Sequence, residues 1–251
     1  MAFVSNPNLP EKAVSLAVVD GRISSCTEER LNALGVKVLK LQPHRGLYPA
    51  VSCHPDMQLH HIGGKTIVYA PGTDQALLDA LASYDFTLIM GDSILTPSYP
   101  VDIAYNVARV GRWYFHNLRH TDPVIRATLE TMGIEPVHVE QGYSKCSLLP
   151  VAKESIITTD AGIARAAEKK GFNVLLVDYE RSICLPGLDH GFMGGASGML
   201  GHSLCALNGN LRSLDCLDAF SSFLSANKIE IVELSEEQVV DIGSILPLMT
   251  Y

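Results

Sequence analysis

The chain has 251 residues, of which 47% are hydrophobic and 18% are charged, and its formal net charge is −8. This composition excludes an intrinsically disordered protein, and the negative charge argues against a nucleic-acid backbone as the main partner. No apolar run approaches the roughly 18 residues that a membrane-spanning helix needs, so we expect no membrane partner either.

The N-terminal sequence and the cysteines indicate a cytoplasmic protein. The first residues, MAFVSNPNLPEKAVSL, lack the basic segment followed by an apolar segment that marks a secretory signal. The six cysteines do not form C-x-x-C pairs, which fits reduced thiols in the cytoplasm. Most of them are expected to be small buried hydrophobic residues.

One phrase recurs five times along the chain. Each copy has a Thr or Ser helix start with an acid close behind it, an amphipathic helix, a turn residue and a β-rich run. The copies start 46, 48, 38 and 54 residues apart, at Thr27, Thr73, Thr121, Thr159 and Ser213. A period of this length is typical of propellers and other repeat arrays.

A β-hairpin is expected before each helix, so each unit runs strand, strand, helix, strand. In the first unit, residues 15–19 and 22–25 flank Asp20-Gly21, a two-residue hairpin turn. The other hairpins pair 56–62 with 66–70, 102–110 with 113–117, 146–151 with 155–159, and 194–200 with 203–207. We expect one domain over 1–251, with units at roughly 13–43, 48–93, 97–141, 142–180 and 188–242.

Both ends of the expected helices carry capping residues. The threonine at a helix start can accept a backbone N–H of the first turn, and the acid after it suits the positive end of the helix. Helix capping is also the favoured explanation for Asp160 and Asn208, which end the second strands of the fourth and fifth units. Left-handed C-terminal caps are expected at Gly35, Gly133, Gly171 and Asn227.

Closing five such units into a ring removes exposed strand edges and points every hairpin at one axis. The unit count, unit length and element order resemble the pentein fold, the five-bladed α/β-propeller of guanidino-group-modifying enzymes. The chain is most similar to an uncharacterised branch of that fold. The motifs that carry the resemblance are HPDM from His54, QGYSKCS from Gln141, TTDAGI from Thr158 and GFMGGASG from Gly191.

The resemblance implies pseudo-five-fold ββαβ repeats around a central channel. It also implies a hydrolase or amidinotransferase-like enzyme that acts on a small guanidino, amidino or related C–N substrate, cationic and amino-acid-like. A non-catalytic ribosome factor shares the fold, so a binding protein or a small-molecule sensor remains the alternative. No cofactor is expected, and no metal site, because no set of ligands has zinc spacing.

His54 and Asp56 are candidate catalytic residues. The starts of the first strands should face the channel, and residues i and i+2 of a strand share a face, so both side chains could enter it. They would act as a general acid/base and its orienting carboxylate, a use that the H-x-D pair of the family's deiminases also implies. The alternative is an ordinary turn around Pro55.

Cys146 is the candidate nucleophile. The neighbouring ammonium of Lys145 would favour the reactive thiolate. Adjacent residues of a strand face opposite ways, however, so the two side chains need not both enter the channel. The alternative is a buried structural cysteine beside a surface lysine.

Residues from the other channel-facing stretches are candidates for substrate binding. Asp102 would pair with the substrate cation, and the backbone of residues 194–198 would shape the pocket and stabilise developing negative charge. The full set of substrate-binding candidates is Asp102, Asn106, Lys145, Asp189, Gly194, Gly195 and Ser197.

The fifth unit departs from the family pattern. In pentein hydrolases a glycine-rich strand of the last unit leads into the catalytic cysteine. Here Ser197 to Leu200 follow the glycines, and the nearest cysteine, Cys205, lies in an apolar run and is expected in the core. Either Cys146 has taken over the role, or the chemistry is not covalent, or there is none.

Overall fold

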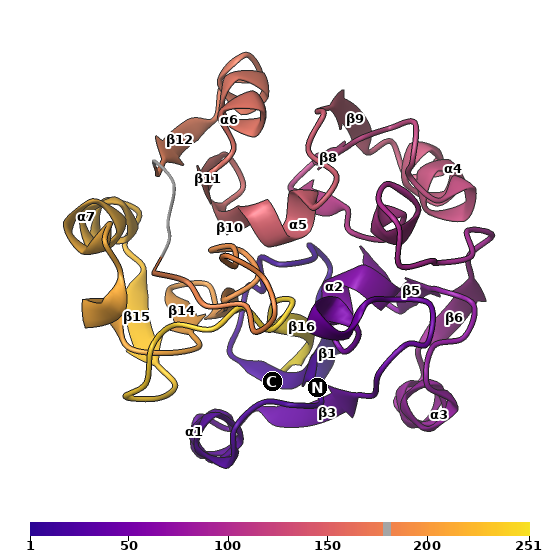
Figure 1. Cartoon of the computed structure of the whole chain (residues 1–251), viewed down its shortest axis with the longest axis horizontal. Coiled ribbons are helices and arrows are strands. Elements are labelled where there is room, and N and C mark those ends of the chain that lie inside the picture. The colour runs from indigo at the N-terminus through magenta and orange to yellow at the C-terminus, as the bar shows by residue number, and fades with distance from the viewer. Residues whose placement is uncertain (178–181) are drawn as a thin grey trace.

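The computed structural model describes residues 1–177 and 182–251. Its strands form five small sheets arranged in a ring, with the longer helices on the outside (Figure 1). In every sheet an antiparallel pair adjoins a parallel strand that returns after the helix. None of the helices in the described ranges is long and apolar enough to cross a membrane.

Units two to five have the expected order of strand, strand, helix, strand. The second contains β4 (Leu59–Gly63), β5 (Thr66–Tyr69), α3 (Gln75–Ser83) and β6 (Thr87–Met90). The third contains β7 (Ala108–Val110), β8 (Trp113–His116), α4 (Pro123–Thr131) and β9 (Glu135–His138). The fourth contains β10 (Leu148–Ala152), β11 (Ser155–Thr158), α6 (Ala161–Glu168) and β12 (Asn173–Leu176). The fifth contains β13 (Ser197–Gly201), β14 (Leu204–Leu207), α7 (Leu217–Ala226) and β15 (Glu230–Glu233), with a short turn η3 (Leu211–Ser213) before the helix.

The first unit is closed by the C-terminal strand rather than by a hairpin of its own. Its elements are β1 (Ala2–Phe3), β2 (Val14–Asp20), α1 (Ser25–Ala33), β3 (Lys37–Leu41) and β16 (Leu246–Thr250), in the sheet order β1-β16-β2-β3. The hairpin predicted at Asp20-Gly21 is wrong, because β16 is the antiparallel partner of β2. The Asp20 carboxylate accepts hydrogen bonds from the backbone N–H and the guanidinium of Arg22, and the chain passes directly into α1.

Four hairpins begin later than the sequence pattern predicts, and in units two, three and four a short helical turn precedes the first strand. These turns are η2 (Val101–Ile103) before β7, α2 (Pro55–Gln58) before β4 and α5 (Ser144–Ser147) before β10. A further short turn is η1 (Pro49–Val51). Proline in the first helical position fixes a helical φ and has no N–H to lose, which favours a turn over a strand in α2. The predicted channel-facing residues of α2 and α5 therefore lie on helical turns, and both turns are near the centre of the ring (Figure 1).

The acid, not the threonine, caps three of the helices. The carboxylates of Asp74, Asp122 and Asp160 accept backbone N–H groups at the starts of α3, α4 and α6. A carboxylate is both a hydrogen-bond acceptor and a negative charge at the positive helix end, so it caps better than the preceding hydroxyl. Ser24 caps α1, whereas α7 has no side-chain cap.

Asn208 caps no helix, which corrects the expectation for that residue. Its amide oxygen accepts from the hydroxyl of Thr27 at 2.9 Å, and its amide nitrogen donates to the carbonyl of Val240 at 3.0 Å. It therefore ties the fifth unit to the first. At the helix C-termini the positive φ predicted for Gly35, Gly133 and Gly171 is confirmed, but in the last unit it falls on Lys228, one residue after Asn227.

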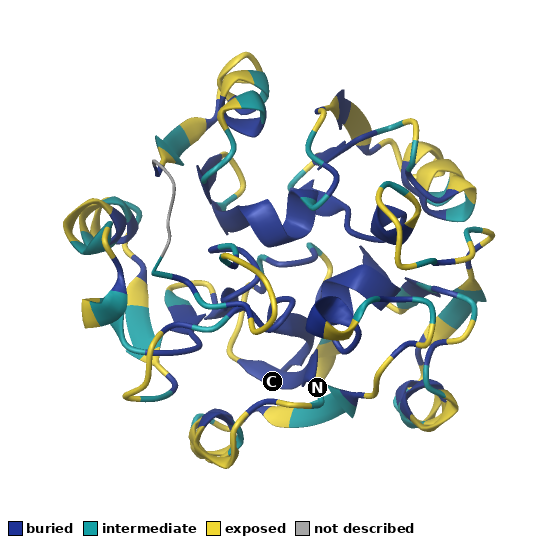
Figure 2. Cartoon of the chain, viewed as in Figure 1, coloured by how far each residue is buried: buried dark blue, intermediate teal, exposed yellow. Residues whose placement is uncertain are grey.

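The core lies between the outer helices and the inner strands. The helices turn apolar residues inward, such as Leu31 in α1, Leu81 in α3 and Leu129 in α4, and all three are fully buried. Figure 2 shows the outer faces of these helices exposed and the centre of the ring buried. Cys205 is fully buried within the core, as the sequence predicts.

The inner strands also bury three histidines, His60 and His61 in β4 and His116 in β8. Burial lowers the pKa of His60 to about 3, helped by the nearby positive charge of Arg109. Burial likewise lowers the pKa of His61 and of His116 to about 4 in each case. All three rings are therefore neutral in the folded protein at physiological pH.

We expect truncation of Leu248, a core residue of β16, to destabilise the folded protein. Leu248 is fully buried in the core cluster that joins the first and second units, so Leu248→Ala should lower the free energy of unfolding by about 2–5 kcal/mol. The same truncation at Met90, which is 57% exposed, should change it by less than about 0.5 kcal/mol. Urea unfolding measures both, and equal effects at the two sites would contradict the assigned role of β16.

We also expect stability to fall as the pH drops below the histidine pKa of the unfolded chain, about 6.5. There the unfolded chain takes up protons that the folded chain, with pKa values of about 3 to 4, does not bind. Each histidine should cost about 1.4 kcal/mol between pH 7.5 and pH 5.5. A His60→Gln variant should lose about that much less than the wild type over this interval in urea unfolding. Identical pH profiles would show that His60 is protonated in the folded state.

Candidate active site

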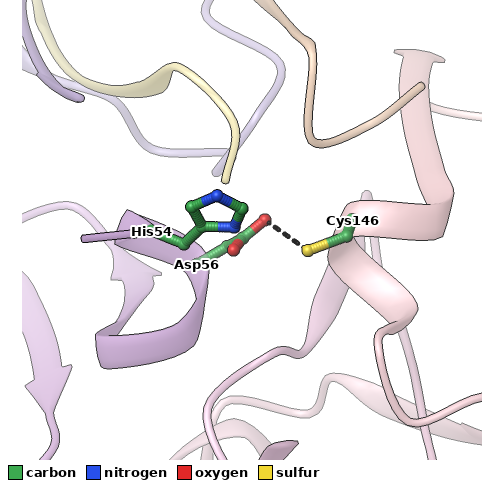
Figure 3. A group of neighbouring side chains, drawn as sticks. All are labelled: His54, Asp56 and Cys146. Atoms are coloured by element: carbon green, nitrogen blue, oxygen red, sulfur yellow. Dashed lines mark hydrogen bonds between the residues drawn. The ribbon is translucent and has the colours of Figure 1, made fainter. Parts of the chain in front are cut away.

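Two short helical turns at the centre of the ring carry the three predicted catalytic residues. His54 is the residue that precedes α2, Asp56 lies in the first turn of α2, and Cys146 lies in α5. The strand geometry assumed for these residues is wrong, but the turns still direct all three side chains to one place (Figure 3). His54, Asp56 and Cys146 are each less than 4% exposed.

The thiol of Cys146 is held by hydrogen bonds from two other units. It donates to the Asp56 carboxylate, with the sulfur 3.1 Å from Oδ2 (Figure 3). The side-chain amide nitrogen of Asn106 donates to the same sulfur at 3.1 Å. The amide oxygen of Asn106 in turn accepts the backbone N–H groups of Lys145 and Cys146, at 2.7 and 3.3 Å. Asn106 therefore fixes both the position of α5 and the direction of the thiol.

Burial raises the pKa of the Cys146 thiol well above its usual value. The nearby carboxylates of Asp56 and Asp241 raise it further, and the hydrogen bond from Asn106 opposes them. Without another positive charge nearby, the sulfur is therefore a neutral thiol. An added cation in contact with these carboxylates would favour the thiolate.

Lys145 is buried close to Asp56 and does not lie on the surface. Its ammonium donates to the hydroxyl of Ser244 at 2.7 Å and to the carbonyl of Gly194 at 3.2 Å. Ser244 in turn donates to Oδ2 of Asp56 at 2.8 Å. Burial lowers the pKa of Lys145, and the negative charge of Asp56 opposes this shift. Lys145 is thus tied to Asp56 through Ser244.

His54 lies between two carboxylates without a hydrogen bond to either. Its Nε2 is 3.9 Å from Oδ2 of Asp20, and its Nδ1 is 3.9 Å from Oδ1 of Asp241. Neither ring nitrogen has a hydrogen-bond partner. A side chain at Gly243, which has φ +64°, would collide with His54. The ring is therefore held by packing, and its two buried nitrogens have no hydrogen-bond partner within the protein.

Asp241 supplies a buried carboxylate that the sequence analysis missed. Its two oxygens accept the backbone N–H groups of Gly243 and Phe192, each at 2.9 Å. Burial raises its pKa, the charge of His54 opposes this shift, and the negative charge of Asp56 adds to it. Gly195 lies against it, where any larger residue would collide with the carboxylate.

These residues form the floor of a cavity of about 320 Å³. Its wall includes the aromatic rings of Tyr143 and Phe192, which stack with centroids 6.4 Å apart. The complete lining is Tyr48, Val51, His54, Tyr143, Cys146, Leu185, Leu188, Asp189, His190, Phe192 and Asp241. A mostly apolar cavity with a few convergent polar groups is the usual form of a small-molecule site.

The predicted site residues divide by their relation to this cavity. His54, Cys146 and Asp189 line it. Asp102 lies behind the wall, where it accepts a hydrogen bond from the hydroxyl of Tyr143 at 2.6 Å, and burial raises its pKa. Ser197 is outside the site, because its hydroxyl is buried against the carbonyl of Met193. The remaining candidates do not line the cavity but lie next to its lining residues Cys146 and Asp241: Asp56, Asn106, Lys145, Gly194 and Gly195.

The sequence did not predict Asp241, which lines the cavity, or Ser244, which bonds to Asp56. Both lie between β15 and β16, in the stretch Asp-Ile-Gly-Ser, which reads as an ordinary polar turn. The available signal was the Gly-Ser turn directly before an apolar run, but the partner of that run is β2, more than 200 residues away in the chain. Tyr143, within the QGYSKCS motif, also lines the cavity but is not among the predicted site residues.

His54, Asp56 and Cys146 are also the residues that could hold a metal ion. One potential ligand atom from each lies within 4.8 Å of the other two. Sequence spacing did not reveal this group because the ligands come from two units. Cysteine binds metal as a thiolate, so an ion here would have to overcome the raised pKa of Cys146.

Residues 18–246 match the sequence profile of DUF6873, a family described as of unknown function. No curated protein matches the chain. The inosamine-phosphate amidinotransferase of Streptomyces griseus has a similar structure, with a TM-score of 0.63 and 13% identity, over 100% of this chain and 97% of that one. An agmatine deiminase of C. jejuni has a TM-score of 0.56 and 9% identity, over 94% of this chain and 93% of that one. A mutant of DDAH from Pseudomonas aeruginosa, complexed with citrulline, has a TM-score of 0.53 and 10% identity, over 88% of this chain and 92% of that one.

These likenesses concern the fold. They confirm the prediction of a five-bladed α/β-propeller of the pentein type. The ring of five sheets and the almost complete coverage of both chains agree on this point.

We expect the Cys146 thiol to react slowly with iodoacetamide at pH 7.5. Its raised pKa keeps it protonated and its burial limits access, so it should react at least about tenfold more slowly than the exposed Cys26. Asp56→Asn removes one of the negative charges that raise this pKa and should speed the reaction several-fold. Mass spectrometry of the alkylated peptides follows both sites. A slower reaction of Cys146 in the Asp56→Asn variant would contradict the electrostatic account.

Proposed function

We infer that this chain, which belongs to the family of unknown function DUF6873, is an enzyme acting on a C–N bond of a small guanidino or amidino compound. The observation that carries the inference is the buried group on the cavity floor. There the Cys146 thiol bonds to Asp56 at 3.1 Å, beside the unpartnered nitrogens of His54. Amidinotransferases and deiminases among the proteins of similar structure support this class of substrate.

The charges of the floor fit a guanidinium or amidinium group. Asp241 lines the cavity, and Asp56 lies directly behind the Cys146 thiol, with its Oδ1 atom buried and without a hydrogen-bond partner. A planar cation with several N–H donors would pair directly with Asp241, and it would lie near the charge of Asp56 without contacting it. It would also lower the pKa of the Cys146 thiol, which the two carboxylates and burial raise in its absence. Substrate binding would thus generate the nucleophile.

The reaction then follows from the positions of the side chains. Cys146 gives up its proton to Asp56 or His54, and its sulfur attacks the central carbon of the substrate, so that an S–C bond forms. The C–N bond to the leaving amine breaks, and His54 supplies the proton that this amine takes away. Water or an acceptor amine next attacks the same carbon, which breaks the S–C bond and restores the thiol. Asn106 keeps the sulfur aimed at the cavity throughout.

Lys145 has a supporting role in this proposal rather than direct contact with the substrate. Its ammonium reaches Asp56 through Ser244 and so stabilises the carboxylate that accepts the thiol hydrogen bond. Because Lys145 does not line the cavity, we no longer expect it to bind the substrate. The two glycines at 194 and 195 let the fifth unit approach α5 and Asp241 closely.

The non-catalytic alternative fits this geometry less well. A ring scaffold without catalysis predicts that the channel residues lie beyond mutual hydrogen-bond reach. Instead, Cys146 bonds to both Asp56 and Asn106, and Ser244 joins Asp56 to Lys145. A chain of buried, mutually bonded titratable groups is costly to fold, which supports a chemical use for it.

We expect Cys146→Ala to reduce turnover by about 10³-fold or more, since loss of a covalent nucleophile has effects of that size. Release of ammonia or amine from a panel of guanidino and amidino compounds identifies a substrate for the wild type. Acid-quenched wild-type enzyme should then carry a mass increase on the peptide that contains Cys146.

The matched control is Cys26→Ala, which removes an exposed thiol far from the cavity and should leave turnover unchanged. Thermal unfolding confirms that both variants are folded. Full turnover by a folded Cys146→Ala variant would refute the nucleophile, and the absence of turnover on any compound of the panel by the wild type would count against the proposed reaction class.

A further inference from the structure

The charged groups that line the cavity all favour a positively charged ligand. Two carboxylates face it, Asp241 on the floor and Asp189 at the exposed mouth. Among the described residues of the lining none is lysine or arginine, and the other titratable groups are two histidines, two tyrosines and Cys146. A ligand that carries a carboxylate would find no fixed cation there.

Among the described residues, Lys145 and Arg22 are two cations of the centre of the ring, and both are already engaged elsewhere. The Lys145 ammonium is buried beneath the floor, where it donates to Ser244 and to the Gly194 carbonyl. Arg22 lines a neighbouring cavity of about 170 Å³ instead. Its guanidinium already makes two hydrogen bonds to Asp20 and one each to the carbonyls of Pro49 and Ala50. Neither side chain is available to a substrate carboxylate.

The lining of the cavity combines one buried carboxylate, one exposed carboxylate and a majority of apolar side chains. The buried carboxylate of Asp241 lies beside His54 and Cys146. Most of the other lining side chains are aromatic or aliphatic, which suits a short alkyl chain. Asp189 is exposed, so an amine that pairs with it keeps part of its hydration. The full set of aromatic and aliphatic lining residues is Tyr48, Val51, Tyr143, Leu185, Leu188 and Phe192.

We propose that the substrate is a dication without a carboxylate, namely a guanidino or amidino group joined by a short alkyl chain to a primary amine. This inference rests on the proposed function and deepens it. The guanidino or amidino end lies at Asp241 and Cys146, and the amine lies at Asp189, which is a specificity-determining residue. This substrate differs from the amino-acid-like cation expected from the sequence in that it has no carboxylate. The α-carboxylate of an amino acid would lie near Asp189 and Asp241, which would repel it.

The test compares compounds of equal chain length that differ only at the far end. 4-Guanidinobutylamine carries an amine, 4-guanidinobutanoate carries a carboxylate, and butylguanidine carries neither. We expect kcat/KM to be at least about tenfold higher for the amine than for the carboxylate, since like charges are strongly unfavourable in a partly desolvated site. Butylguanidine should fall between them.

Variants at the cavity mouth assign this preference to one residue. Asp189→Asn should reduce kcat/KM for the amine by about two- to fivefold, the range of an exposed ion pair, and should change the value for butylguanidine by a smaller factor. Asp189→Lys should raise the value for the carboxylate compound. Asp79→Asn, which removes an exposed acid on α3, is the charge-matched control and should change nothing. Arg181 is a cation that lies outside the described residues. Arg181→Ala therefore tests whether this residue binds the carboxylate compound.

Binding to Cys146→Ser, measured by calorimetry, separates this inference from the proposed function. If that variant prefers the amine while the wild type turns over none of the compounds, the ligand class holds and the reaction fails. If the wild type turns over the carboxylate compound best, the reaction holds and the ligand class fails. A carboxylate preference that Arg181→Ala abolishes would overturn the inference in the same way. Absence of binding by all three compounds would overturn both proposals.

Discussion

The pairing of the C-terminal strand β16 with β2 is the interaction on which the rest of the structure depends. It supplies the first unit with the antiparallel strand that its own sequence lacks, and so closes the ring. The segment that leads into β16 carries Asp241, Gly243 and Ser244 to the centre. There they contact His54, Asp56 and Lys145. Closure of the ring therefore also brings these residues to the floor of the cavity.

The centre of the ring places charged groups where burial disfavours charge. Cys146 and Asp241 have raised pKa values, and Lys145 has a lowered one, each chiefly because of burial. Hydrogen bonds from Asn106, from Ser244 and from backbone N–H groups offset part of this cost. A bound cation would relieve the remaining unfavourable charge, which links ligand binding to activation of the thiol.

Much of the fold could be predicted from the sequence, because its determinants are local and repeated. Helix starts, glycine caps and hairpin turns recur with a regular period, and the element order of four units follows from them. The predictions failed where a partner comes from far along the chain. The hairpin at Asp20-Gly21 is the main example, since the strand that replaces it lies more than 200 residues away.

The sequence by itself determined the five-fold repeat, the polar inner ends of the units and the presence there of His54, Asp56 and Cys146. Residue type and local spacing are sufficient for these conclusions. Only the tertiary structure decided which polar residues share one cavity. In the structure Lys145 is buried against Ser244 outside the cavity lining, and Ser197 bonds to Met193 instead of facing the cavity. Asp241, which follows the last helix, lines the cavity. The physical reason is that contacts between units depend on how the ring closes, and no local pattern encodes that closure.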